Sequence, residues 1–172
     1  MDAWTDWIDC ARFEGARELC ARVRRSAAML PQPASPREGE PYSRTLLART
    51  AHGEVMLAAW GEGARCAPHD HGGASGFVLV LAGSFRETRY EFDGEKLRRR
   101  SERCLRAWEC SQAPEAAIHD LCAERGGITL HVYAPCIEQM RVFDVEQRAT
   151  LLVPGDRGAW LQPVAERATW KA

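Results

Sequence analysis

Residues 61–83 read GEGARCAPHDHGGASGFVLVLAG, and this stretch carries the main signals for both the fold and the chemistry of the chain. Its last part, from Phe77 to Ala82, is a short apolar run bounded by glycines, which is typical of a buried β-strand. His69 and His71 lie two residues apart shortly before it. Because side chains at i and i+2 of an extended chain point to the same face, both imidazoles can face one interior.

From about residue 42 onward the chain consists of short strand-like runs. They lie at residues 55–60, 77–82, 85–92, 128–133, 140–145 and 149–153. Asp93-Gly94, between two of these runs, is a strong signal for a two-residue hairpin turn. Short strands with Gly and Pro turns and no helices between them indicate a sandwich or barrel. We therefore expect a mainly β fold, a closed antiparallel β-barrel.

The N-terminal residues follow a different period. Apolar side chains recur at spacings of three and four between residues 2 and 30, which predicts one amphipathic helix. The prolines at 31, 33 and 36 end this helix and form a stiff connector. A chain of 172 residues suits one domain. We expect that domain to span 1–172, with the helical segment and connector at 1–36 and the β-barrel at 41–172.

Charge and hydropathy exclude several classes of partner. Lys and Arg number 23 against 24 Asp and Glu, so the net charge of −1 argues against broad binding to nucleic acid or to anionic membranes. The basic run at 96–103 is interrupted by acid and predicts the solvated face of a strand. No apolar run approaches the roughly 18 residues of a membrane helix, and no secretory signal is visible. We expect a cytoplasmic protein, either a monomer or a small homo-oligomer.

The seven cysteines are scattered and form no CxxC pair. This pattern supports neither a zinc ribbon nor a thioredoxin-like redox site. It favours free thiols in a reducing cytosol. Cys66 and Cys122 lie close to candidate metal ligands, and we interpret both as packing residues.

The His-x-His pair alone fits either a metal site or two packed or surface histidines beside a turn. The glycines around it favour a metal site. With Gly63, Gly76 and Gly83 at their observed spacing, the stretch resembles the first motif of the cupin superfamily, in which the position of Gly76 carries a glutamate. Residues 114–119, PEAAIH, resemble the second motif, which ends in a histidine, here His119.

The resemblance implies a ligand set of three histidines and no carboxylate: His69, His71 and His119. Three neutral imidazoles suit Fe, Zn, Cu or Ni and leave the full 2+ charge on the metal. Such a site is matched to a substrate that is itself an anion, for example a thiolate, and leaves positions open for that substrate and dioxygen. Zinc with a bound water, for hydration or hydrolysis, fits the same ligands.

A longer series of segments resembles the thiol dioxygenases and, within them, the cysteine dioxygenase family. In family order between residues 41 and 145, the segments are PYSRTLL, WGEGARCAPHDHGGASG, LAGSFRETRYEF, SERCLR, AIHDL, ITLHVYAP and RVFD. The resemblance implies a cupin-type, jelly-roll-like β-barrel. It also implies one mononuclear non-haem Fe(II) per chain, held by the three histidines.

The same resemblance implies roles for residues around the metal. Arg44 would form the salt bridge to the substrate carboxylate, a task for which a planar guanidinium is suited, and Tyr42 would line the same pocket. Thr129, His131 and Tyr133 fall where the family has a Ser-His-Tyr relay. Their alternation along one strand independently places them on one face. A buried strand whose polar groups only satisfy one another is the alternative interpretation.

Two positions depart from the mammalian members. There, a cysteine at the position of Gly76 is crosslinked to the relay tyrosine by a thioether. That crosslink cannot form here, which is typical of bacterial-type members. Met140 replaces another pocket-lining cysteine. Both changes reshape the pocket.

We therefore expect an enzyme that oxidises L-cysteine with O2 to cysteine sulfinic acid. The alternative substrate is 3-mercaptopropionate or another small mercapto acid, although relatives that prefer it tend to have Gln at the position of Arg44. A different metal-dependent cupin enzyme, and a cupin that binds a small molecule without turnover, remain as alternatives.

Overall fold

Nine β-strands and two short α-helices form the part of the chain that the computed structural model describes, residues 3–161 and 167–169. The helices are α1 (Ala3–Phe13) and α2 (Ala16–Ser26), and a 3-10 turn follows at Ala27–Met29. The strands are β1 (Thr45–Thr50), β2 (Gly53–Trp60), β3 (Ser75–Phe92), β4 (Leu97–Arg106), β5 (Cys110–Ala113), β6 (Ile118–Ala134), β7 (Gln139–Asp144), β8 (Ala149–Pro154) and β9 (Arg167–Thr169). The expected mainly β fold with an N-terminal helical segment is confirmed.

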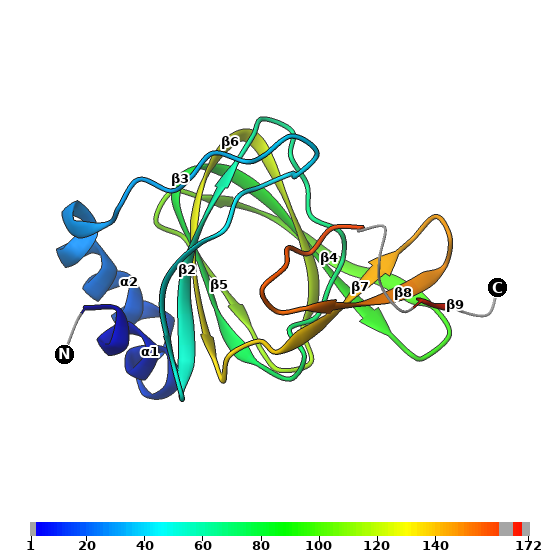
Figure 1. The fold of residues 1–172 in the computed structure, drawn as a ribbon, viewed down its shortest axis with the longest axis horizontal. Coiled ribbons are helices and arrows are strands. Elements are labelled where there is room, and N and C mark those ends of the chain that lie inside the picture. The colour runs from blue at the N-terminus through cyan, green and yellow to red at the C-terminus, as the bar shows by residue number, and fades with distance from the viewer. Residues whose placement is uncertain (1–2, 162–166, 170–172) are drawn as a thin grey trace.

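The strands form two antiparallel sheets (Figure 1). One has the order β1-β2-β6-β3-β4, with β5 also paired to β3, and the other has the order β7-β8-β9. The long strands β3 and β6 lie side by side at the centre of the first sheet, where Gly76 pairs with Tyr133 and Val78 with His131. This register brings the first motif of the sequence against the predicted relay.

The expected closed ring of strands is wrong. The segment 65–69 lies against both sheets, but its strand pairing is limited to isolated bridges: Arg65 to Cys122, and His69 to both His119 and Val142. Pro68 has no N–H to donate, so this segment cannot build a regular ladder at that point. The two sheets therefore face each other without a continuous run of hydrogen bonds between them.

Several strand boundaries differ from the sequence prediction. The separate runs at 77–82 and 85–92 are one strand, β3, whose register shifts on both sides of Gly83. The run at 128–133 is only the second half of β6, because the Gly126-Gly127 bend interrupts its apolar pattern without ending its pairing with β3. Strands β1, β5 and β9 were not predicted at all. The residues predicted to be a solvated strand face lie mainly in β4, which is exposed at most positions.

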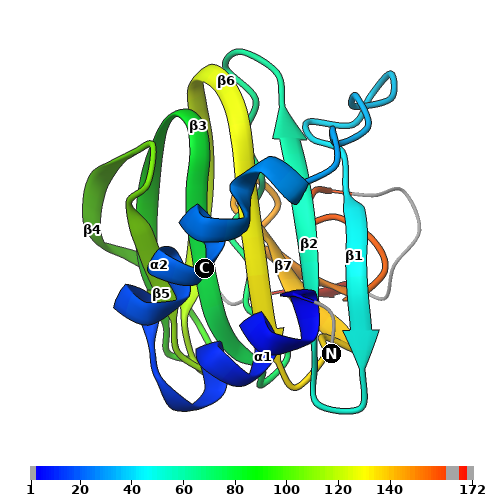
Figure 2. The same ribbon diagram turned by 90° about the vertical axis from the view of Figure 1, so that its left-hand side faces the viewer.

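The N-terminal segment forms two helices rather than the predicted single one. Gly15, at φ +87°, adopts a left-handed conformation that lets the chain turn back between α1 and α2. Figure 2 shows both helices lying across the outer face of the six-stranded sheet. Their buried side chains Trp7, Ile8, Leu19 and Val23 belong to the predicted apolar stripe. The stripe is therefore real, although the helix is broken.

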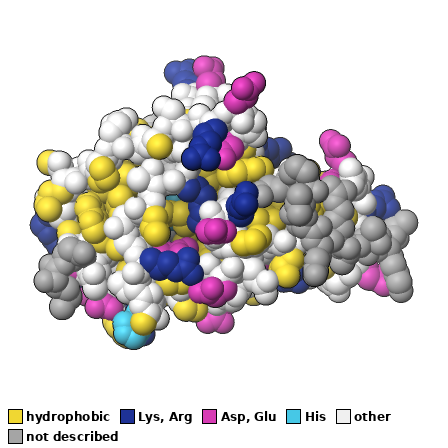
Figure 3. Space-filling model, in the orientation of Figure 1, with side chains coloured by type: hydrophobic (Ala, Val, Ile, Leu, Met, Phe, Trp, Pro, Cys, Tyr) yellow, Lys and Arg dark blue, Asp and Glu magenta, His cyan; other side chains and the backbone are white. Residues whose placement is uncertain are grey.

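The surface carries both signs of charge. Acidic and basic side chains are interspersed over the face shown in Figure 3. On β4, Arg98 pairs with Asp93 at 2.5 Å and Arg99 with Glu102 at 2.6 Å. The basic run is therefore balanced by neighbouring acids. Neither described α-helix, at 11 residues each, is long and apolar enough to cross a membrane.

Candidate metal centre

Three buried histidines converge between the two sheets. His69 and His71 come from the segment before β3, and His119 lies near the start of β6. A pair of backbone hydrogen bonds between His69 and His119, 2.9 and 3.0 Å long, brings the two segments together. Each histidine has a candidate ligand atom within 4.8 Å of those of the other two. The predicted ligand set is thus brought to one point.

The ring nitrogens of two of these histidines are arranged as metal ligation requires. His69 Nδ1 lies 2.9 Å from the carbonyl oxygen of Ala67, and His119 Nδ1 lies 2.9 Å from Glu87 Oε1. In both rings an oxygen acceptor faces Nδ1, which leaves Nε2 for a cation. His71 has its Nε2 3.2 Å from the Tyr133 hydroxyl. Its buried Nδ1 has no hydrogen-bond partner among the described residues.

Burial keeps the imidazoles of His69 and His71 neutral. Desolvation, followed by the proximity of His119, lowers the pKa of His69 to about 3. The same two causes hold the pKa of His71 well below its usual value. A neutral imidazole has a lone pair to offer at physiological pH, so no proton has to leave before a metal binds. These donors fit a divalent transition metal such as Fe, Zn, Cu or Ni.

A buried carboxylate that the sequence analysis did not single out lies behind His119. Glu87, in β3, is fully buried, and besides His119 it receives hydrogen bonds from Ser111 and Arg103. Burial acts to raise the pKa of Glu87, but the hydrogen bonds from His119, Ser111 and Arg103 hold it below its usual value. Its spacing of two from the buried Phe85 was the available signal, because it places an acid on the inward face of a strand.

The three relay residues form a chain of hydrogen bonds on the inner face of β6. Thr129 Oγ1 lies 2.8 Å from His131 Nε2, and His131 Nδ1 lies 3.1 Å from the Tyr133 hydroxyl. At the far end, the Trp60 indole N–H donates to Thr129 at 2.9 Å. Desolvation, helped by the positive charge of Arg44, lowers the pKa of His131 to about 3. Burial raises the pKa of Tyr133, so its phenol keeps its proton at neutral pH.

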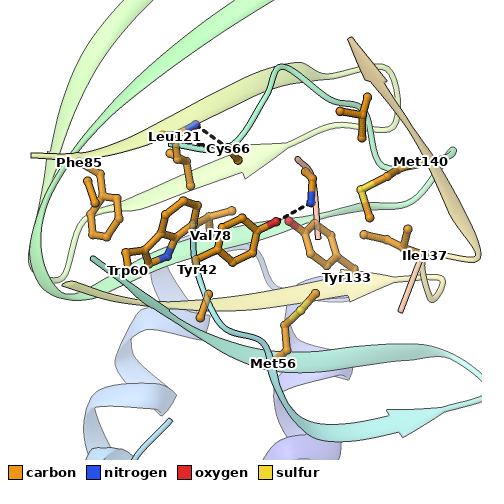
Figure 4. Close-up of a cluster of buried hydrophobic side chains, with 14 of the residues drawn as sticks. Tyr42, Met56, Trp60, Cys66, Val78, Phe85, Leu121, Tyr133, Ile137 and Met140 are labelled. Carbon is orange, nitrogen blue, oxygen red and sulfur yellow. Dashed lines mark hydrogen bonds between the residues drawn. The ribbon is translucent and has the colours of Figure 1, made fainter. Parts of the chain in front are cut away.

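A small pocket opens beside the histidines. Its walls are mainly apolar, and Figure 4 shows Tyr42 and Tyr133 lying between Trp60 on one side and Met140 on the other. Tyr42 stacks on Trp60 at 4.2 Å between ring centroids and accepts a hydrogen bond from the N–H of Ala159 at 2.6 Å. Among the described residues, the pocket lining includes two guanidinium groups and no carboxylate. The pocket therefore favours an anionic occupant.

Arg44 lies just before β1 and lines this pocket. Its Nη1 donates to the carbonyl oxygen of Gly155 at 2.8 Å and to that of Arg157. Its Nε and Nη2 face the Met56 sulfur at 3.3 and 3.2 Å. One edge of the guanidinium is thus anchored to the backbone, while the other meets only a weak acceptor.

Seven of the eight site residues expected from the sequence line one pocket: Tyr42, Arg44, His69, His71, His119, His131 and Tyr133. The eighth, Thr129, lies behind His131. Cys66 also lines the pocket, but its sulfur accepts the N–H of Leu121 at 3.1 Å, and burial raises the pKa of the thiol to about 12. This placement suits a packing residue. His52 is exposed and lies away from the pocket.

Gly76 lies directly against Tyr133. A Cβ atom built on it would lie 2.5 Å from Cδ1 of the Tyr133 ring. A larger residue at position 76 would therefore force the ring or the backbone of β6 to move. Gly76 has no side chain that could serve as a metal ligand, which agrees with a ligand set made only of histidines.

Residues 37–146 match the family model for cysteine dioxygenase type I. The chain belongs to the cysteine dioxygenase type I family. All eight expected site residues lie within the matched residues. Helices α1 and α2 precede the match, and β8 and β9 follow it.

The family's curated members are distant in sequence. Over 97 residues the chain is 27% identical to cysteine dioxygenase type 1 of Rattus norvegicus, an alignment that covers 52% of this chain and 48% of the relative. The identity and both coverages are the same for cysteine dioxygenase type 1 of Homo sapiens. The chain thus spans about half the length of the curated relatives it matches.

Solved structures give weaker similarities. A RmlC-like cupin from Shewanella frigidimarina aligns with a TM-score of 0.49 and 21% identity, over 60% of this chain and 85% of its own. A protein from Halomonas sp. named KdgF aligns with a TM-score of 0.49 and 19% identity, over 59% of this chain and 87% of its own.

Proposed function

We propose that the protein is an Fe(II)-dependent thiol dioxygenase that oxidises L-cysteine to cysteine sulfinic acid. The reaction is RSH + O2 → RSO2H, in which both oxygen atoms end on sulfur. The observation that carries the proposal is that three buried histidines share one small pocket with the guanidinium of Arg44. When bound by His69, His71 and His119, Fe(II) supplies the positive charge that favours a thiolate and the redox chemistry with dioxygen.

Arg44 is placed to bind the carboxylate of the substrate. Its Nε and Nη2 present two parallel N–H groups, the geometry that holds a carboxylate through both oxygens. The Met56 sulfur now in front of them is a poor acceptor, so an incoming carboxylate improves both hydrogen bonds. The bonds from Nη1 to Gly155 and Arg157 keep the guanidinium plane fixed meanwhile.

Tyr133 is placed to orient the reacting atoms. Its hydroxyl lies next to His71 and is itself held by His131. Because burial keeps the phenol protonated, Tyr133 can donate a hydrogen bond to an anionic sulfur or to a developing oxygen anion. His131 and Thr129 fix the direction of that O–H. The apolar walls at Met56, Leu121, Ile137 and Met140 exclude water and strengthen these interactions.

The amine of cysteine is what distinguishes the two candidate thiols. Among the described residues, no carboxylate lines the pocket to pair with an ammonium group. The amine would then be available as a neutral donor to a metal held by the three histidines, a role that 3-mercaptopropionate, which has no amine, cannot fill. The presence of Arg44 at the carboxylate position supports cysteine, as expected from the sequence.

The state of the cysteines supports a reducing compartment. All seven are free thiols in the structure. Unpaired cysteines are the rule in the cytoplasm and the exception in secreted proteins of this size. We include a cytoplasmic location in the proposal.

The test is oxygen uptake by the Fe(II)-loaded protein, with L-cysteine and 3-mercaptopropionate offered side by side. We expect one O2 consumed per sulfinate formed from cysteine. Uptake with 3-mercaptopropionate alone would keep the reaction and overturn the substrate. Zinc binding without iron would favour another metal-dependent cupin enzyme. Binding of thiol without uptake, despite bound iron, would favour a binding protein.

Arg44→Ala tests the carboxylate site. Loss of hydrogen bonds to a charged group costs about 1.5–3 kcal/mol, so KM for cysteine should rise about 10- to 100-fold while metal content stays unchanged. Arg98→Ala is the matched control, because Arg98 is an exposed arginine of the β3–β4 hairpin that pairs with Asp93. Unchanged kinetics in Arg44→Ala would refute the role of Arg44.

A further inference from the structure

We infer that Glu87 is a positioning residue for the metal. The geometry indicates that its carboxylate fixes the tautomer and the direction of the His119 ring. It also places a negative charge one hydrogen bond behind a ligand set that contains none. The inference rests on the proposed metal site and not on the identity of the thiol.

Glu87 lies where four strands meet, and both of its oxygens are occupied. Oε1 accepts from Ser111 Oγ of β5 at 2.5 Å and faces His119 Nδ1 of β6 at 2.9 Å. Oε2 accepts from Arg103 Nε of β4 at 2.7 Å and lies 3.4 Å from Arg89 Nε of β3 itself. Arg89 also donates to Ser111 at 3.0 Å. The carboxylate therefore has a single orientation.

The contacts of Glu87 link the surface of the sheet to the metal site. A buried carboxylate is costly unless it is paired and hydrogen-bonded. Arg103 and Arg89 are partly exposed and supply positive charge from the outside of the sheet. With the charge compensated from that side, the Glu87 carboxylate faces His119 Nδ1 as a hydrogen-bond acceptor, and the acceptor favours the tautomer with its proton on Nδ1. His119 Nε2 is left as a lone pair that faces the other two histidines.

The other two histidines have no such partner. His69 Nδ1 meets a neutral backbone carbonyl, and the Nδ1 of His71 has no partner among the described residues. Within the described chain, Glu87 is the one carboxylate in an ion pair with any of the three histidines. A histidine that donates to a carboxylate becomes a more basic ligand. Gly76 cannot supply a negative charge as a ligand. Glu87 supplies one through its hydrogen bond to the ligand His119.

The experiment compares Glu87→Gln with Asp120→Asn. Glutamine keeps the shape of Glu87 and one acceptor oxygen but removes the charge. Asp120 is the matched control, because it is fully buried and adjacent to His119 in β6, yet it binds Arg65 and Tyr90 rather than a histidine. The readout is the dissociation constant for Co(II) alone, measured by competition with a chromophoric chelator, and thermal unfolding of each apo protein checks that it is folded.

We expect Co(II) to bind about 10- to 100-fold more weakly to Glu87→Gln and with unchanged affinity to Asp120→Asn. Wild-type affinity in Glu87→Gln, or an equal loss in both variants, would overturn the inference. Should Glu87→Gln fail to fold, the ¹⁵N resonances of the His119 ring in the wild-type apo protein decide: a proton on Nδ1 supports the inference and a proton on Nε2 overturns it.

These readouts need neither thiol nor oxygen. A wild-type protein that binds Co(II) with the help of Glu87, and then fails to oxidise cysteine after loading with iron, would refute the proposed reaction and leave the role of Glu87 intact. A wild-type protein that binds no divalent metal would refute both.

Discussion

The two faces of the six-stranded sheet are built from the same strands and serve different purposes. Along β6, Leu130 and Val132 point outward to the helices. The residues that alternate with them point inward to the site: Thr129, His131 and Tyr133. On β2, Leu57 packs outward while Met56 lines the pocket. Because strand side chains alternate between faces, one short segment can be structural and chemical at once.

The role of the outer face is to bury apolar side chains. It forms a cluster between the sheet and helices α1 and α2 whose fully or nearly fully buried members are Trp7, Ile8, Cys10, Leu19, Val23, Val55, Leu57, Phe77, Leu79, Leu130 and Val132. The inner face instead carries polar atoms, and most of those in the site are held by specific hydrogen bonds. The comparison teaches that stability and chemistry can be perturbed separately, and the predictions below test that separation.

The largest effect is expected on the inner face, from His71→Ala. Loss of a ligand should remove metal binding and lower turnover by more than about 100-fold, beyond the cost of losing a residue that only hydrogen-bonds to a ligand. The apo variant should stay folded, because the imidazole it loses has a buried nitrogen without a hydrogen bond. Metal analysis, oxygen uptake and thermal unfolding measure the three effects. Retained metal with normal turnover would remove His71 from the ligand set.

Leu130→Ala should have the opposite profile. Leu130 is fully buried on the outer face, so its truncation should lower the free energy of unfolding by about 2–5 kcal/mol. Turnover per bound metal should not change below the melting temperature. Urea unfolding and oxygen uptake on the same preparation test this. A large loss of turnover in the folded variant would show that the two faces are coupled.

Acid should weaken the inner face through His131. Its pKa is about 3 in the folded chain and about 6.5 when unfolded, so below pH 6.5 the unfolded state takes up a proton that the folded state does not. Stability therefore falls as the pH drops from about 6.5 toward 3. At pH 5, His131 alone should lower the free energy of unfolding by about 2 kcal/mol relative to neutral pH. Urea unfolding at pH 7 and pH 5 should show a smaller loss in His131→Gln, and an equal loss in both proteins would contradict the assignment.

Tyr133→Phe should have the smallest effect. It removes one hydroxyl and keeps the ring, so turnover should fall by up to about 10-fold, the value of one hydrogen bond. Oxygen consumption should also exceed sulfinate formation. Co(II) affinity should remain that of the wild type, which separates this change from Glu87→Gln. Unaltered coupling of oxygen to product would count against the role of the hydroxyl.

Local patterns predicted part of this site, and the resemblance to the thiol dioxygenases supplied His119, Arg44 and Tyr42. The spacing of His69 and His71 and the alternation of Thr129, His131 and Tyr133 depend only on the two-residue period of a strand. The buried stripe of the N-terminal segment likewise follows from helical spacing. These are signals within one segment, so the sequence carries them directly.

Contacts between distant segments that the resemblance does not describe were missed. Glu87 meets His119 only because β3 and β6 pair in one register, which no local period reveals. The bend at Gly126-Gly127 is indistinguishable in sequence from the end of a strand. The two sheets lack a continuous ladder between them because Pro68, in the segment that lies beside both, has no N–H to donate. In each case the deciding partner is far away along the chain.

Gly76 has a consequence for how the protein matures. With no side chain facing the Tyr133 ring, position 76 offers no atom for a covalent link to that ring. Turnover therefore cannot create a covalent link between position 76 and Tyr133, and a preparation should contain no species that differs by such a link, whatever its history of turnover. The specific activity of the preparation should not rise with use. Electrophoresis should not separate the protein into crosslinked and uncrosslinked populations.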